Sequence, residues 1–234
     1  MRIMIGDIEG TGLKVPEPPA SGVVQVATID IAWDAGHRKA VEISSFCEMV
    51  DPGCPIEPGA SAIHGFYDDD VLGKPKLEEV FHIKEPVYFL AYNRPFDFKR
   101  LAHRMDNCVG GFCVLQAARR FLKGPENHKL QTLVEHYDLT RHKAHDALGD
   151  VRATLEVLNL VMLQSGAEDL FALGNLINTP KVPDVMPFGI HKGKPFRELP
   201  SSYIVFALGL QDLDPGLRTA LEMQRRLRGN SVEL

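Results

Sequence analysis

Cysteine is scarce in this chain and is not spaced for a structural role. The 234 residues include only Cys47, Cys54, Cys108 and Cys113, which lack the paired short spacing of a zinc site. Four cysteines are also too few for a disulfide scaffold in a chain of this length. We therefore expect reduced thiols and a cytoplasmic location.

Long apolar runs are missing as well. The longest, YIVFALGL at residues 203–210, is far shorter than the roughly 20 residues that cross a bilayer. The first ten residues, MRIMIGDIEG, carry one basic residue and too short an apolar run for a signal peptide. We therefore expect no membrane partner.

A net positive charge is also absent. The formal net charge is −5 at pH 7, so any nucleic-acid binding needs a local basic patch or a bound metal. Residues 185–234 hold 7 Lys+Arg and 5 Asp+Glu, a net of +2, which leaves 19 and 26, a net of −7, for residues 1–184. The sequence thus predicts an acidic part followed by a mildly basic part.

The hydrophobic pattern predicts an α/β domain with a small appendage. Strand-like apolar runs are found at residues 2–9, 22–33, 41–50 and 85–93. We expect the first three to form a meander. Helical spacing is found at residues 95–105, 113–122, 129–139 and 145–163. We expect a domain at residues 1–165, a linker at 166–184 and a small C-terminal extension at 185–234.

Two carboxylates stand at the end of the first predicted strand. Asp7 and Glu9 are two positions apart, so their side chains share one face. A solvated strand end is the ordinary alternative, but an apolar run precedes the pair and a glycine-rich turn follows it. Two carboxylates on one face of a buried strand need a counter-charge, and Mg²⁺ or Mn²⁺ suits such oxygen ligands.

Further acidic residues follow in two later segments. Asp97 stands in the first turn of a predicted helix, where its charge also suits the helix N-terminus. Asp150 lies beside the apolar stripe of the last helix of the domain, and His145 stands at the start of that helix. Asp146, the next residue, can serve simply as the N-cap of that helix.

The segments DIEGTGL, YNRPFD and HDALGD resemble, in order and approximate spacing, the motifs of the DEDDh exonucleases. The resemblance covers roughly residues 1–165. It implies the ribonuclease H-like exonuclease fold, with a central mixed five-stranded sheet flanked by helices. It also implies 3′-to-5′ hydrolysis of nucleic acid to nucleoside 5′-monophosphates.

The same resemblance assigns roles in the predicted site. Two divalent ions, Mg²⁺ or Mn²⁺, would be held by Asp7, Glu9, Asp97 and Asp150, with His145 as general base. Gly10 would let the backbone approach the terminal nucleotide, and Leu13 and Phe96 would stack on the last bases. Core packing is the alternative for Phe96.

The remaining expected substrate contacts come from the matched motifs and one loop. Thr11 and Asn93 belong to the motifs, and SAIHGF resembles the family's A-x-x-H-G loop, which would bring His64 to the terminal sugar or base. The alternative is that His64 packs within its loop and contacts no substrate.

The C-terminal segment FGIHKGKPFRELPSSY resembles the extension of exonuclease X-like bacterial proteins. This resemblance favours DNA as the partner, bound as a single strand or at its 3′ ends. It does not decide between a monomer and a homodimer. Lys192, Lys194 and Arg197 would contact phosphates, with a solvated turn as their alternative. Two other functions stay open, an RNA-trimming or oligoribonuclease-type exonuclease and a polymerase-associated proofreading subunit.

Overall fold

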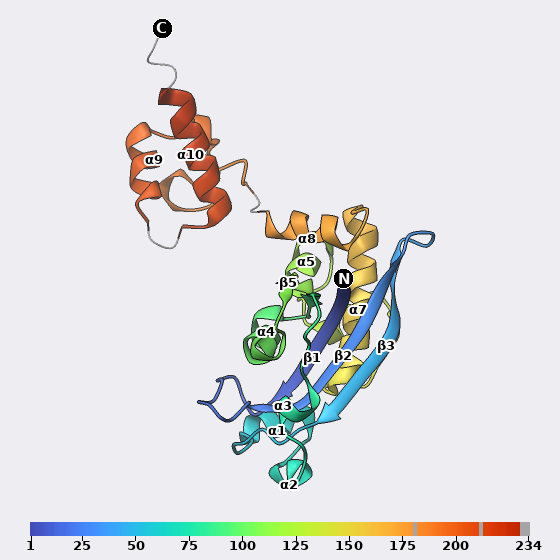
Figure 1. Cartoon of the computed structure of the whole chain (residues 1–234). Helices are drawn as coiled ribbons and strands as arrows, with labels where there is room; N and C mark the ends of the chain where they lie inside the picture. Colours follow the sequence, from blue (N-terminus) through green and yellow to red (C-terminus); the bar gives the residue numbers. More distant parts are fainter. Residues whose placement is uncertain (180–181, 211–212, 230–234) are drawn as a thin grey trace. The chain divides into compact units, whose positions relative to one another are not determined.

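The strand that carries Asp7 and Glu9, β1 (Arg2–Gly10), lies in the middle of a five-stranded sheet. β1 pairs antiparallel with β2 (Val23–Asp34), which pairs antiparallel with β3 (Lys39–Met49). On its other side β1 pairs in parallel with β4 (Val87–Leu90), and β4 pairs in parallel with β5 (Cys108–Gly110). The predicted meander and mixed sheet are confirmed, with the order β3-β2-β1-β4-β5 (Figure 1).

Successive side chains of β1 point to opposite faces of the sheet. Ile5 is fully buried in a core that the long helix α7 (Ala147–Ser165) shares, and Met4 is fully buried in a second core on the opposite face. Asp7 and Glu9 alternate in step with Ile5, so they point toward the first core. The strand therefore directs both carboxylates to the face that α7 covers.

Helices pack on both faces of the sheet. Besides α7 they are α1 (Pro58–His64), α2 (Asp68–Val71), α3 (Leu77–Val80), α4 (Arg94–Leu101), α5 (Val114–Phe121), α6 (Leu130–His136) and α8 (Leu170–Asn178), with a 3-10 turn at Ala102–Arg104. The buried side of α7 includes Val151, Leu158 and Met162, as its spacing predicts. Asp146 is the N-cap of this helix, and its side chain accepts a hydrogen bond from the N–H of Gly149 at 3.4 Å.

The computed structural model describes residues 1–179, 182–210 and 213–229, and the chain divides into two units, Met1–Ile177 and Asn178–Leu234. The first unit continues past residue 165, where we expected a linker, because α8 buries Leu170 and Leu173 in the core around α7. Within the described residues, no helix is both long and apolar enough to span a membrane.

The second unit has its own small core. It contains 3-10 turns at Gly189–His191 and Phe196–Glu198, followed by α9 (Ser201–Leu208) and α10 (Pro215–Gly229). Its core side chains include Met186, Ile204, Leu217 and Leu221, each at most 1% exposed.

The packing of α7 gives a direct test of the fold. Replacing Leu158, which is fully buried, with Ala leaves a cavity and should lower the free energy of unfolding by about 2–5 kcal/mol. Leu163→Ala is the matched control on the same helix, because Leu163 is 75% exposed, and it should change stability by less than about 0.5 kcal/mol. Urea denaturation measures both, and equal losses would contradict the packing described here.

Candidate active site

Asp7, Glu9 and Asp150 meet where the end of β1 faces the first turn of α7. One carboxylate oxygen of each residue lies within 4.8 Å of those of the other two. Glu9 is 9% exposed, so part of this charge lies inside the protein. Strand alternation predicted that Asp7 and Glu9 share a face, and the resemblance to DEDDh exonucleases implied that Asp150 joins them.

Asp150 is held by neighbours on both of its oxygens. Gln131 of α6 donates a hydrogen bond to Oδ1 at 3.1 Å, and the backbone N–H of His145 donates one to Oδ2 at 3.2 Å. The start of α7 is tied to the sheet, because the N–H of Ala147 donates to Oε1 of Gln25 on β2 at 2.8 Å. These contacts fix Asp150 relative to β1.

Asp97, on α4, also reaches the site. It is not one of the three residues whose carboxylate oxygens lie within 4.8 Å of one another. Its side chain is 2% exposed, and its Oδ1 accepts a hydrogen bond from the backbone N–H of Ile8 at 3.2 Å. Its charge is close enough to raise the pKa of Asp7. Asp97 therefore flanks Asp7, while Glu9 and Asp150 form the group with Asp7.

Burial and mutual repulsion raise the pKa of each of these carboxyl groups. The pKa of Asp7 is raised well above its ordinary value, first by burial and then by the charges of Asp97, Asp150 and Glu9. Burial, with the charges of Asp150 and Asp146, raises the pKa of Glu9 to about 7. Burial raises the pKa of Asp97 to about 8, and burial also raises that of Asp150.

Such a cluster is unstable as four free anions and is suited to a cation. All of its donor atoms are carboxylate oxygens, the ligands that Mg²⁺ and Mn²⁺ prefer. Among the described residues, no basic side chain is close enough to lower the pKa of Asp7 or of Glu9. The donor set therefore fits one or more divalent ions.

His145 stands beside Asp150 with an exposed side chain, in the left-handed backbone region at φ 56°. The segment before α7 packs closely against the helix at Gly149, where an added Cβ would lie 2.1 Å from the carbonyl oxygen of Lys143. The glycine in HDALGD is therefore needed for the turn that carries His145. The sequence analysis gave this glycine no role.

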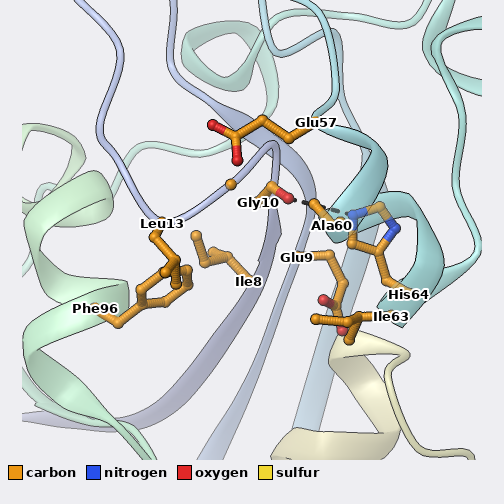
Figure 2. Close-up of a pocket in the computed structure, with 11 residues that line it drawn as sticks. Ile8, Glu9, Gly10, Leu13, Glu57, Ala60, Ile63, His64 and Phe96 are labelled. Atoms are coloured by element: carbon orange, nitrogen blue, oxygen red, sulfur yellow. Dashed lines mark hydrogen bonds between the residues drawn. The ribbon is translucent and has the colours of Figure 1, made fainter.

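A cavity of about 410 Å³ opens next to Glu9. Figure 2 shows Ile8, Leu13 and Phe96 on one side and Ile63 and His64 on the other, with Glu9 between them. Of the predicted substrate contacts, those that line it are Gly10, Leu13, His64 and Phe96.

His64 and Leu13 differ in how firmly they are held at this cavity. The Nε2 atom of His64 lies 3.3 Å from the carbonyl oxygen of Gly10, and burial lowers the pKa of this ring. Leu13 is 87% exposed at the rim, where it can contact a ligand.

The other two predicted contacts lie elsewhere. Thr11 is buried, and its backbone joins two loops through hydrogen bonds from its N–H to Gly22 and from the N–H of Glu57 to its carbonyl oxygen. Asn93 is exposed at the N-cap position of α4. Neither residue lines the cavity.

Sequence reasoning missed Glu57 and Ile63, which line the cavity, and Arg100, which supports one of its walls. Arg100 is 5% exposed, stacks 4.1 Å from the ring centre of Phe96, and donates hydrogen bonds to the carbonyl oxygens of Gly12 and Lys14 at 2.8 and 3.1 Å. It thereby joins α4 to the loop after β1. A basic residue near the end of a helix gave no signal of this role.

The mixed sheet, with Asp7, Glu9 and Asp150 meeting at the end of its first strand, has the ribonuclease H-like exonuclease fold. Residues 4–158 match the family described as Exonuclease. The chain belongs to this family, and the resemblance to DEDDh exonucleases is confirmed.

Two curated relatives show how far the similarity extends. The chain is 30% identical over 192 residues to a DNA polymerase III subunit epsilon-like protein of Rhodobacter capsulatus, covering 76% of this chain and 26% of that protein. It is 27% identical over 232 residues to Exodeoxyribonuclease 10 of Escherichia coli K12, covering 94% of this chain and 97% of that protein. The second match includes the C-terminal unit.

Solved structures show the same fold. Exonuclease X in complex with 5′ overhanging duplex DNA matches with a TM-score of 0.59 and 24% identity, covering 75% of this chain and 99% of that one. The nuclease domain of 3′hExo, a DEDDh family member bound to rAMP, matches with a TM-score of 0.52 and 16% identity, covering 71% of this chain and 94% of that one.

The raised pKa values predict how pH affects the metal-free protein. In the folded state Glu9 and Asp97 bind protons up to pH 7–8, whereas the unfolded chain releases them near pH 4. The folded state therefore holds more protons in this window, and the free energy of unfolding should fall as pH rises through it, by about 1.4 kcal/mol for each pH unit over which one such group is protonated in the folded chain only.

Urea denaturation in EDTA at pH 5 and pH 8.5 measures this fall. Asp97→Asn should make it smaller, and Asp69→Asn, at an exposed position on α2, should leave it as in the wild type. The electrostatic account would be contradicted if the wild type and Asp97→Asn showed the same pH dependence.

Proposed function

We propose that this chain is a divalent-metal-dependent exonuclease that removes nucleoside 5′-monophosphates from the 3′ ends of DNA, with single strands preferred. The observation that carries the proposal is the meeting of Asp7, Glu9 and Asp150 within 4.8 Å beside a cavity of about 410 Å³. The near full-length similarity to Exodeoxyribonuclease 10 supports DNA as the substrate.

The four carboxylates suit a pair of divalent ions. Asp7, Glu9 and Asp150 would be ligands, and Asp97 would add a fourth carboxylate beside Asp7. When bound, such ions supply an activated water and stabilise the leaving 3′ oxygen of a phosphodiester. The protein holds the ligands rigid through the bonds to Asp150 and Asp97 described above.

His145 is proposed as the general base. A neutral imidazole can accept a proton from an attacking water. The neighbouring Asp150 carboxylate would stabilise the imidazolium formed, as an opposite charge does at short range. Exposure of the His145 side chain then allows the proton to pass to solvent.

The cavity explains action at a chain end. Leu13 and Phe96 face Ile63 and His64 across a space large enough for a small ligand, with Glu9 between the two sides (Figure 2). We infer that the terminal nucleotide occupies this space with its base between apolar side chains. Arg100 would keep the Phe96 side in place by bonding the loop that carries Leu13.

The C-terminal unit is proposed to assist with substrate rather than to catalyse. Lys192, Lys194 and Arg197 are exposed and would contact phosphates. We propose a cytoplasmic enzyme with a nuclease unit and this small extension; a homodimer stays a prediction.

A polymerase-associated proofreading role is the second candidate. The observation in its favour is the similarity to proteins named DNA polymerase III subunit epsilon, including one from Treponema pallidum at 26% identity over 83% of that protein. A proofreading subunit would gain activity on primer–template ends when its polymerase is added. An exonuclease that acts alone would degrade free single strands at full rate without one.

Digestion of DNA labelled at its 5′ end tests the proposal. The wild type with Mg²⁺ or Mn²⁺ should yield a ladder shortened from the 3′ end, should release 5′-monophosphates, and should cleave DNA faster than RNA of the same sequence. Asp7→Asn should lower kcat by about 10³-fold, and His145→Ala should lower it by about 10²–10⁴-fold.

Asp69→Asn is the matched control and should retain wild-type kcat, because Asp69 lies on α2 outside the carboxylate group. Circular dichroism checks that each variant is folded. Hydrolysis at the wild-type rate in Asp7→Asn, or in the wild type with EDTA, would refute the mechanism. Faster cleavage of RNA would favour the RNA-trimming alternative.

A further inference from the structure

The C-terminal unit exposes large apolar side chains that its own core does not need. The core described above is already closed, with Met186 and Leu221 fully buried and Ile204 1% exposed. Yet Ile190 is 85% exposed and Phe206 is 63% exposed. Exposed apolar side chains mark a binding surface where they gather in one patch.

Phe206 belongs to a row of three rings on this unit, His191, Tyr203 and Phe206, which we call the aromatic row. The His191 and Tyr203 rings are 4.4 Å apart between centres and meet edge to face at 79°. The Tyr203 and Phe206 rings are 6.0 Å apart. The row therefore joins the loop at residues 188–194 to the exposed side of α9.

The loop that supplies His191 has a fixed conformation. The N–H of Met186 donates to the carbonyl oxygen of Lys194 at 2.9 Å, and the N–H of Gly193 donates to that of Met186 at 2.8 Å. Gly189 and Gly193 have φ values of 72° and 82°, which favour glycine. At Gly189 an added Cβ would lie 2.8 Å from the Tyr203 hydroxyl, so the loop packs directly on the row.

The same loop carries positive charge that nothing nearby neutralises. Lys192 and Lys194 are exposed, and no salt bridge to either is found among the described residues. Arg197 is also exposed, and the one salt bridge it forms within the described part of the chain is with its neighbour Glu198, at 3.7 Å.

Two other arginines of the unit, Arg218 and Arg228, have internal partners and are not comparable. Arg218 donates to the carbonyl oxygens of Leu208 and Leu210, and Arg228 donates to Ser201 and to the carbonyl oxygen of Arg197. Arg225 and Arg226 on α10 are exposed as well, so the loop cations differ from them in lying next to the aromatic row.

The chemistry of a single-stranded nucleic acid fits this surface, which has one exposed ring, Phe206, two half-buried rings and two lysines. Bases stack on aromatic side chains, and phosphates pair with Lys or Arg. An apolar protein partner would cover the rings but would leave the lysine charges without counter-charges. We propose that the aromatic row, with Lys192 and Lys194, binds single-stranded DNA away from the terminal nucleotide. This inference rests on the proposed exonuclease function, for which it supplies a second binding surface.

The test compares KM for a long strand with KM for a dinucleotide, using the full chain with Mg²⁺. The strand has about 30 nucleotides, longer than the roughly 4–16 that one binding module covers. The row variant is Phe206→Ala with Lys192→Gln and Lys194→Gln. Its KM for the strand should rise by about tenfold or more relative to its KM for the dinucleotide, as expected from the loss of one stacked base.

A matched control removes the same groups from another surface of the unit. Met223→Ala with Arg225→Gln and Arg226→Gln takes away one apolar side chain that is 61% exposed and two exposed cations on α10. This control should keep the wild-type ratio of the two KM values. The row variant should also reduce the slope of log KM against log salt, by about 0.7 for each lost phosphate contact.

Each outcome bears on one proposal only. An unchanged KM ratio in the row variant, or an equal change in the control, would overturn the inference while leaving the exonuclease intact. Failure of the wild type to cleave either substrate would instead refute the proposed function.

Discussion

Electrostatic repulsion among buried carboxylates is the constraint on which the rest of this structure depends. Asp7, Glu9 and Asp150 bring their oxygens together, Asp97 adds its charge to Asp7, and burial withholds the water that would screen them. Left as free anions, these groups would destabilise the fold. A protein that keeps such a cluster must either hold protons there or bind cations, and the raised pKa values describe the first of these states.

The fold maintains the cluster from three separate segments. The alternation of β1 directs two carboxylates toward α7, the first turn of α7 supplies the third, and α4 supplies the fourth. Backbone and side-chain donors hold the last two, through Gln131 and His145 on Asp150 and through Ile8 on Asp97. The large apolar cores on both faces of the sheet stabilise this arrangement against the repulsion, so a site that is costly by itself can persist.

Local patterns were enough to predict much of this from sequence. The period of two places Asp7 and Glu9 on one face, the helical period places Asp150 beside a buried stripe, and the motif order connects them with Asp97. Short elements such as β5, with three residues, and α1 to α3 have too few residues for a periodic signal. The role of Arg100 depends on a loop about 86 positions away in the chain, a contact that local spacing cannot reveal. We expected a linker at residues 166–184, whereas Leu170 and Leu173 of α8 complete the core around α7.

Direct titration with Mn²⁺, followed by electron paramagnetic resonance at pH 8, tests the central claim without relying on turnover. The account predicts that the wild-type chain binds Mn²⁺ and that Asp7→Asn weakens this binding by at least about tenfold, or about 1.4 kcal/mol. Asp69→Asn, which alters charge on α2 by the same amount, should bind as the wild type does. Equal Mn²⁺ affinity in Asp7→Asn and the wild type would contradict the claim that these carboxylates form one cation site.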